Sequence, residues 1–203
     1  MIAKQDYAIG ALVGFLVGVF AIPTLLNLEF RDRTILLLLP LAVPFIFVFG
    51  IWVGKILSRW LAVLAQVAKF SAVGLLNTAI DFGVLNLLSM ATGVTAGLVV
   101  GGVNIPGFVL ALINSYLWNK YWVFQHRDGG VTGDFPKFFA VAVVGLLMNS
   151  IVVVTLTLVP PILAVDSQVW LNIAKVVASL TSLAWNFFGY KFLVFKAPKA
   201  LLA

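Results

Sequence analysis

Long apolar stretches alternate with short polar segments along this sequence, and the pattern predicts membrane-spanning helices. A helix needs about 20 apolar residues to cross roughly 30 Å of hydrocarbon. Six stretches of that length fit between the charges and turn residues, at 8–26, 34–54, 70–90, 98–118, 138–160 and 169–190. We therefore expect an all-α polytopic membrane protein with six transmembrane helices. A secretory signal peptide is the alternative for the first stretch, but its length and the lack of a small-residue cleavage site favour a retained span.

The composition agrees with lipid as the solvent. Hydrophobic residues make up 63% of the 203 positions and charged residues 10%, whereas a soluble domain carries charge at about a quarter of its positions. This excludes a soluble enzyme and a nucleic-acid-binding domain. Cysteine is absent and His126 is the one histidine, so disulfides and thiolate sites are impossible and a metal site is not expected. We expect no cofactor.

Lysine and arginine are concentrated on one predicted side of the membrane. Thirteen basic residues stand against seven acidic ones, a net charge of +6, and cytoplasmic loops retain basic residues during insertion. The side that holds both termini carries Lys4, Lys55, Arg59, Lys69, Lys120, Arg127, Lys137, Lys191, Lys196 and Lys199, and the opposite side carries Arg31 and Arg33. Both termini are therefore expected to be cytoplasmic, in the cytoplasmic membrane of a prokaryote.

The second part of the chain repeats itself. Residues 69–73 (KFSAV) align with 137–141 (KFFAV), and after a shift of three residues 120–124 (KYWVF) align with 191–195 (KFLVF). Each unit would contain two spans, an even number, so both units enter the membrane from the same side as parallel repeats. The sequence predicts a duplicated four-helix core at 69–196, with repeat one at 69–124, repeat two at 137–195 and a cytoplasmic tail at 197–203.

Residues 1–68 have no counterpart in this repeat and are expected to form a two-helix N-terminal hairpin. An amphipathic connector helix is expected between Lys55 and Lys69, because its apolar residues share one face. Gly10, Gly14 and Gly18 recur at a spacing of four, which lets helices approach closely in lipid. A homodimer contact through the same glycine stripe is the alternative, and we expect a homo-oligomer, a dimer.

Several polar residues fall inside the predicted spans. Asp81 follows Lys69 by 12 residues, about 18 Å of helix, which is near the middle of the membrane. A charge there costs roughly 2.5 to 3.5 kcal/mol, so Asp81 must face protein, a cavity or a partner. The last span carries a polar stripe from Asn172 to Tyr190, and Lys175 could instead reach the headgroups. The candidate substrate-binding residues are Asn77, Asp81, Asn104, Asn114, Trp118, Asn119, Lys120, Asn149, Asn172, Lys175, Ser182, Asn186, Tyr190 and Lys191. A structural contact between helices is the alternative for the residues within the spans, and ordinary positive-inside anchoring is the alternative for Lys120 and Lys191.

These residues resemble the GtrA family of small membrane proteins. The resemblance rests on Lys69-Phe70, Val73-Gly74, Asn77, Asp81-Phe82 and 114–124, and then on Lys137-Phe138, Asn149, Asn186 and 191–195. It implies translocation of a polyprenyl-phosphate-linked monosaccharide for cell-envelope polysaccharide or glycoprotein modification, with a polyprenyl-phosphate glycosyltransferase and membrane lipids as partners. Two features depart from the family pattern: the N-terminal hairpin, and a segment from Asn114 to Lys120 that is one residue longer than that from Asn186 to Lys191.

The implied substrate suits these side chains. Lysine would engage the phosphate, asparagine and serine the sugar hydroxyls, and a tryptophan ring could stack on the sugar. Catalysis is not expected, because no spatially paired carboxylates, ligand cluster or nucleophile beside a base can be assigned. Two alternatives stay open: a proton-coupled exporter of small amphiphiles that uses Asp81, and a non-transporting scaffold for a glycosyltransferase.

Overall fold

The computed structural model describes residues 2–93, 98–126, 130–158, 177 and 180–195, without the side chains of 98–104, 131–132, 149–150, 153–154 and 157. The secondary structure of this described part is helical. Its elements are α1 (Lys4–Asn27), α2 (Arg33–Leu57), α3 (Val63–Thr92), α4 (Leu98–Trp118), the π-helical turn η1 (Asn119–Val123), α5 (Val131–Leu158) and the π-helical turn η2 (Tyr190–Val194). Residues 180–189 form a helix that leads into η2. The chain divides into two units, Met1–Gln125 and His126–Ala203, and each is described by itself.

The predicted helices of the first unit are present with small shifts. Helices α1, α2 and α3 are long and apolar enough to cross a membrane, so the chain is a membrane protein. The expected connector helix is not a separate element, because α3 begins at Val63 and continues without a break to Thr92. Residues 58–62 instead form the turn between α2 and α3. Six spans remain a prediction, since residues 169–176 and 178–179 of the last predicted span lie outside the described residues.

Local sequence signals fix the helix ends. The Asp32 carboxylate accepts hydrogen bonds from the backbone N–H groups of Thr34 (2.9 Å) and Ile35 (3.1 Å), which caps the start of α2. Gly93 ends α3 in the left-handed conformation, with φ of 71°, a backbone geometry that glycine adopts without steric cost. This glycine lies in the short segment between the third and fourth predicted spans, 70–90 and 98–118.

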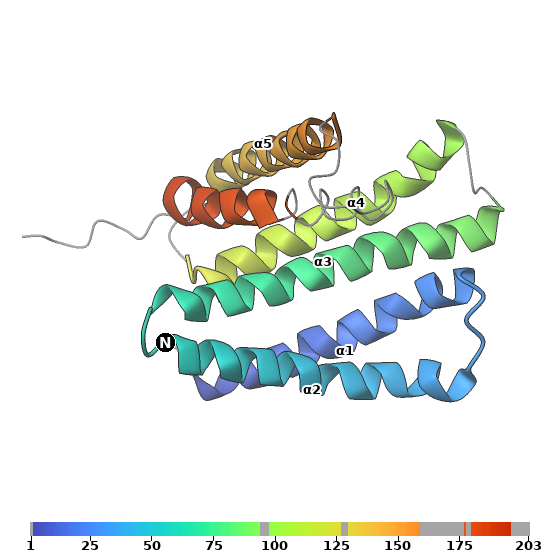
Figure 1. Ribbon diagram of the computed structural model, residues 1–203, viewed down its shortest axis with the longest axis horizontal. Helices are drawn as coiled ribbons and strands as arrows, with labels where there is room; N and C mark the ends of the chain where they lie inside the picture. The colour runs from blue at the N-terminus through green and yellow to red at the C-terminus, as the bar shows by residue number, and fades with distance from the viewer. Residues whose placement is uncertain (1, 94–97, 127–129, 159–176, 178–179, 196–203) are drawn as a thin grey trace, which may run out of the picture. The chain divides into compact units, whose positions relative to one another are not determined.

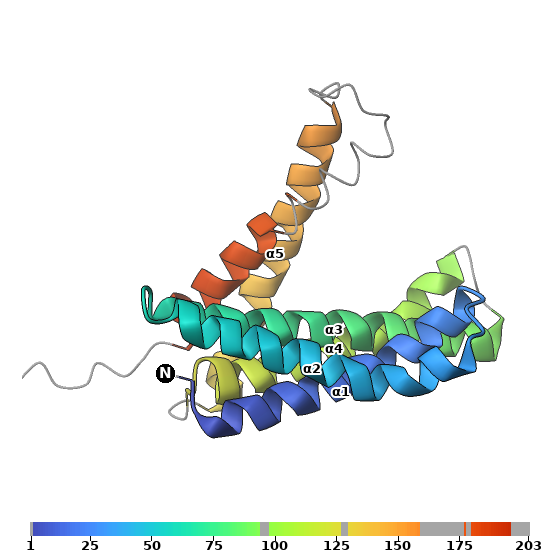
Figure 2. The ribbon, with the colours of Figure 1, turned by 60° about the horizontal axis from the view of Figure 1, so that its bottom comes forward.

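Helices α1 to α4 lie side by side in both ribbon views (Figure 1, Figure 2), and α1 packs against both α2 and α3. The glycine stripe of α1 makes the first contact: a Cβ atom on Gly14 would lie 2.7 Å from the Cα atom of Pro44, and one on Gly18 would lie 2.6 Å from that of Pro40. The packing interpretation of this stripe is therefore confirmed. A homodimer would need a different surface, because α2 already covers the stripe.

A buried ion pair joins α1 to α3 near the N-terminus. The Lys69 ammonium lies 2.7 Å from Asp6 Oδ1, and the two side chains are 4% and 2% exposed. Trp122 Nε1 donates a hydrogen bond of 2.8 Å to the same oxygen, and the Ala3 backbone N–H donates one of 2.7 Å to Oδ2. The ammonium also lies 5.8 Å from the centre of the Trp122 ring. One carboxylate of the hairpin therefore connects the start of α3 to the turn that follows α4.

The other end of α1 is joined to α3 by amides. Asn27 Nδ2 donates a hydrogen bond of 2.6 Å to Asn86 Oδ1, and Asn86 Nδ2 donates one of 3.3 Å to Thr24 Oγ1. Between these two polar junctions, a Cβ atom on Gly83 would clash with the backbone oxygen of Phe20. Helices α1 and α3 thus touch closely along their length.

Both units end in the same local structure. Phe124 N–H bonds to the Asn119 carbonyl at 2.9 Å, and Phe195 N–H bonds to the Tyr190 carbonyl at 2.8 Å. These bonds span five residues, as in a π-helix. In the first unit the Phe70 ring lies 6.4 Å from the Phe124 ring, and in the second the Phe138 and Phe195 rings are 6.3 Å apart. The residues that meet are those that the internal alignment pairs.

Removing the carboxylate of Asp6 should destabilise the first unit. Asp6→Ala leaves the Lys69 ammonium buried without its counter-ion, and breaking a buried pair in this way costs about 3 to 5 kcal/mol. Thermal unfolding in detergent, followed by tryptophan fluorescence, measures the effect. Asp6→Asn keeps an acceptor oxygen and should lose less stability. An alanine variant as stable as the wild type would show that the pair does not support the fold.

Single cysteines should report the topology, because the chain contains none of its own. Leu28→Cys, in the turn after α1, should react with an impermeant thiol reagent added outside intact cells. Ser58→Cys, in the turn after α2, and Gln125→Cys, after η1, should react only after permeabilisation, because basic residues flank both sites. The reverse labelling pattern would invert the expected orientation.

Candidate functional site

Amide side chains connect α3 and α4 inside the first unit. Asn114 Nδ2 donates a hydrogen bond of 2.7 Å to Asn77 Oδ1, and Trp118 Nε1 donates one of 3.0 Å to Asn114 Oδ1. Trp118 then contacts Trp122 edge to face, with ring centres 5.6 Å apart. Three predicted site residues are therefore brought together, and their chain of contacts leads to the Asp6–Lys69 pair through Trp122.

Asp81 lies one helical turn beyond Asn77, where α3 and α4 approach closely at Gly107. A Cβ atom on Gly107 would lie 2.7 Å from the Asp81 backbone oxygen and 3.1 Å from Asp81 Oδ1, so only glycine fits this position of α4. The Oδ1 atom is buried and has no hydrogen-bond partner among the described residues. A side-chain oxygen buried without a donor is costly, especially in lipid. Asp81 thus differs from Asn77, whose oxygen accepts from Asn114.

The π-helical turn η1 buries two further predicted residues. Asn119 and Lys120 are each 1% exposed. Asn119 Nδ2 donates hydrogen bonds to the Ser115 carbonyl (2.8 Å) and to Ser115 Oγ (3.2 Å), while its Oδ1 atom has no partner within the described part of the chain. Lys120 Nζ lies 3.3 Å from the Tyr116 hydroxyl. A lysine that only marks the cytoplasmic side would be exposed to headgroups, so the burial of Lys120 argues against that interpretation.

The second unit contains a related arrangement. Asn186 lies against Gly145, and its Oδ1 atom is buried without a partner among the described residues. Trp185 Nε1 donates a hydrogen bond of 3.0 Å to the Val141 carbonyl, and the buried Tyr190 ring stacks on Phe138 at 4.3 Å. Ser182 is half-buried on the same helix. Gly145 aligns with Asn77, so Asn186 touches the position that Asn114 touches in the first unit.

Lys191 is held differently from Lys120. It is half-buried, and its ammonium lies 5.7 Å from the Phe187 ring centre and 5.6 Å from that of Phe192. The two lysines occupy the same position of their π-helical turns but have different exposure.

The remaining predicted residues are not described in full. Asn172 and Lys175 lie outside the described residues, so a pair between Asp81 and Lys175 is untested. Asn104 in α4 and Asn149 in α5 are described only as parts of their helices. No group of three or more metal-binding side chains occurs among the described residues.

Sequence reasoning missed the cluster of Asp6, Lys69 and Trp122. From the sequence, Lys69 is interpreted as a basic residue on the side of the termini, as the start of repeat one and as part of the family resemblance, and the hairpin is placed outside the core. One signal was available: Asp6 is the acidic residue closest to the start of a chain that is mostly apolar, and an acid beside a predicted span needs a partner.

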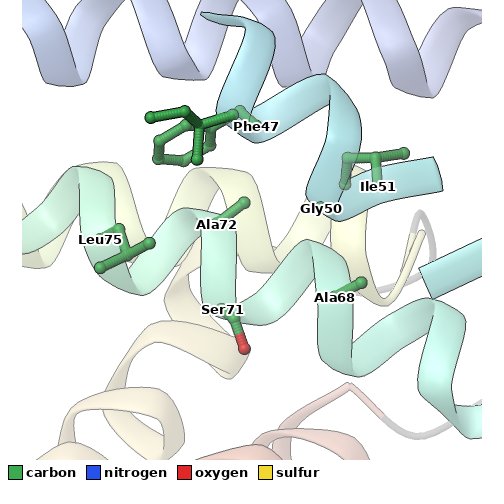
Figure 3. Close-up of a pocket in the computed structure, with 8 residues that line it drawn as sticks. Phe47, Gly50, Ile51, Ala68, Ser71, Ala72 and Leu75 are labelled. Carbon is green, nitrogen blue, oxygen red and sulfur yellow. The ribbon is translucent and has the colours of Figure 1, made fainter. Parts of the chain in front are cut away.

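An apolar groove lies between α2 and α3 (Figure 3). It has a volume of about 240 Å³ and is lined by Ile46, Phe47, Gly50, Ile51, Ala68, Ser71, Ala72 and Leu75. Gly50 leaves space here, since a Cβ atom at this position would have no neighbour within 4 Å. The groove suits a hydrocarbon chain, whereas the contacts between α3 and α4 suit polar groups.

The comparisons with known proteins give one match. Neither the curated proteins nor the solved structures include a match to this chain. The family model of the GtrA/DPMS transmembrane domain matches residues 69–195. The match begins at Lys69 and ends at Phe195, the limits of the two aligned segments, and it covers more than half of the chain. The chain therefore belongs to the GtrA/DPMS transmembrane-domain family.

Proposed function

We propose that this protein moves a polyprenyl-phosphate-linked monosaccharide from the cytoplasmic to the outer leaflet of a prokaryotic cytoplasmic membrane. The observation that carries the proposal is the GtrA/DPMS match over residues 69–195. Membership in this family indicates involvement in lipid-linked sugar handling. A polyprenyl-phosphate glycosyltransferase would supply the substrate on the side of the termini, and the sugar would modify cell-envelope polysaccharide or glycoprotein outside.

The proposed architecture is a six-span protein with a duplicated core. The matching ring contacts of Phe70 with Phe124 and of Phe138 with Phe195 support the duplication. The π-helical turns at 119–123 and 190–194 support it further, because π-helical turns are rare. The contact of Asn77 with Asn114 would then be equivalent to that of Gly145 with Asn186. In this pairing the first repeat has one extra residue between its asparagine and Lys120.

Each unit by itself offers buried oxygens to a sugar. Asp81, Asn119 and Asn186 each have a buried side-chain oxygen without a donor in the described part of the chain. Sugar hydroxyls are donors, and they could supply the missing hydrogen bonds. Asn77 and Asn114 already bond to each other, so their contribution would be to keep α3 and α4 in register beside Asp81.

The phosphate and the prenyl chain need different surroundings. Lys120 and Lys191 stand at the ends of the two repeats, where each would offer a cation to a phosphodiester on the side of the termini. The groove between α2 and α3 is apolar and is lined by two helices long and apolar enough to cross a membrane, which suits an isoprenoid chain. Translocation in this scheme breaks no covalent bond, and we propose that the protein is not an enzyme.

A proton-coupled exporter is the second candidate, and one observation favours it. Asp81 Oδ1 lacks a donor among the described residues, which would suit a carboxyl group that binds and releases a proton during transport. In that case the transport rate would depend on a pH gradient, and small amphiphilic cations would be carried.

Liposomes test the substrate directly. The purified protein should speed the exposure of a labelled polyprenyl-phosphate sugar to an outside probe, relative to empty liposomes. Lys191→Ala should slow this exposure about tenfold, because a hydrogen bond to a charged group contributes about 1.5 to 3 kcal/mol. Lys191→Arg should slow it less, since the charge remains. Lys137→Ala, at an exposed lysine, is the control. Equal rates in empty and protein-containing liposomes would refute the proposal.

Asp81→Asn tests the mid-membrane carboxylate. The amide has nearly the same shape, so the variant should insert and unfold like the wild type while transport falls. Folding is measured by thermal unfolding in detergent, and transport by the liposome assay at equal pH on both sides and with a pH gradient. Wild-type transport by Asp81→Asn would make Asp81 a structural residue. Cation efflux that requires the gradient would favour the exporter.

A further inference from the structure

A small polar cavity lies beside Lys69, in the first unit. Its volume is about 70 Å³, and it is lined by Ala65, Gln66, Lys69, Val123, Phe124 and Gln125. The first three belong to the beginning of α3, and the others to η1 and the residues directly after it. One water needs about 10 to 15 Å³ of such space, so the cavity has room for several water-sized groups, as a phosphate requires.

The Lys69 ammonium has donors for a second anion. It carries three N–H bonds, and Asp6 Oδ1, at 2.7 Å, uses one of them. Asp6 in turn shares its charge with two further donors, Trp122 Nε1 and the Ala3 N–H. The carboxylate therefore does not interact with Lys69 alone. The lysine side chain is 4% exposed, and an ion-pair interaction is stronger at such a buried site than in water.

Two of the residues that line the cavity, Gln66 and Gln125, carry side-chain amides, and Gln125 also has a strained backbone. Gln66 and Gln125 can each donate from an NH₂ group to an anion. Gln125 has a φ of 52°, in the left-handed region that residues other than glycine seldom adopt. Strain of this kind is concentrated at binding sites, where the surrounding structure maintains it. Here the strained residue is the second one after the π-helical turn, and it lines the cavity.

We propose that Lys69, Gln66 and Gln125 form a binding subsite for a phosphate ester, and that Asp6 is the internal anion with which the phosphate competes for Lys69. The subsite rests on the proposed function insofar as the phosphate is that of the lipid-linked sugar. It belongs to the first repeat. Lys137, which aligns with Lys69, is exposed, and Leu193 stands where Trp122 does.

Equilibrium binding to the full-length protein in lipid nanodiscs tests the subsite. The probes are tritiated farnesyl phosphate and tritiated farnesol, which share the chain but not the charge. Asp6→Asn should bind farnesyl phosphate more tightly than the wild type, because the competing charge is gone. The double variant Asp6→Asn/Lys69→Gln should bind it about tenfold more weakly than the wild type, since the charged donor is lost. Farnesol binding should not change in either.

Two further variants separate binding from folding. Gln125→Gly keeps the left-handed backbone without strain and removes the amide, so it should weaken farnesyl phosphate binding in a folded protein. Lys137→Gln is the matched control and should bind like the wild type. Thermal unfolding of each variant in detergent confirms that the protein is folded. A double variant that binds farnesyl phosphate as tightly as the wild type would overturn the subsite, and so would equal affinities of Asp6→Asn and the double variant.

Inorganic phosphate identifies the source of the anion. If it displaces farnesyl phosphate at millimolar concentration, the subsite recognises the phosphate itself; if it does not, the subsite recognises the phosphate only when a lipid carries it. Both results support the subsite. The proposed function can fail separately from the subsite. Lys69-dependent binding without lipid-sugar translocation in liposomes would support the subsite and refute the proposed translocation.

Discussion

Lipid offers no hydrogen bonds, so every polar group that enters the membrane must find its partner inside the protein. The pairing of Asp6 with Lys69 is the point at which this constraint organises the first unit. The lysine begins the family domain, the acid belongs to the preceding hairpin, and the Trp122 indole that bonds to the same oxygen lies in the turn after α4. The start of α3, the end of α4 and the hairpin are thus held by one carboxylate.

The same constraint separates polar side chains that have a hydrogen-bond partner from a buried oxygen that has none among the described residues. The Asn77 and Asn114 side chains hydrogen-bond to each other, and so do those of Asn27 and Asn86. Asp81 Oδ1 stands against the backbone at Gly107 and receives no donor from the described residues. Paired amides hold helices together at little cost, whereas an unpaired oxygen destabilises the empty protein. Such oxygens are therefore the places where a polar ligand would gain most.

The sequence predicted what depends on local pattern and missed what depends on distant pairs. Apolar length located α1, α2 and α4 to within a few residues, the glycine spacing identified the face that α1 turns to α2, and Gly93 marked the end of α3. The limits of the family domain followed from the aligned Lys-Phe and Val-Phe segments.

Three features could not be predicted in this way. The partner of Asp6 is more than 60 positions away, and no periodicity links the two residues. The start of α3 at Val63 was missed because the apolar residues between Lys55 and Lys69 share one face, which favoured a separate amphipathic helix. In the structure Gln66 and Lys69 are at least half-buried. Lys120 was expected at a basic surface, but the π-helical turn directs it inward, and hydrophobic spacing contains no signal for such a turn.

The π-helical turns have a consequence for the phase of each helix. An α-helix advances 100° per residue, and a π-helical turn accommodates an extra residue that the following chain must absorb. Each turn stands at the end of its helix, so the residue that follows it, Phe124 or Phe195, is rotated relative to its place in a continuous α-helix. Deleting a single residue from either turn would let the helix end in α-helical form and would rotate the terminal aromatic residue away from Phe70 or Phe138. The length of these short segments, and not only their composition, is therefore part of what the sequence encodes.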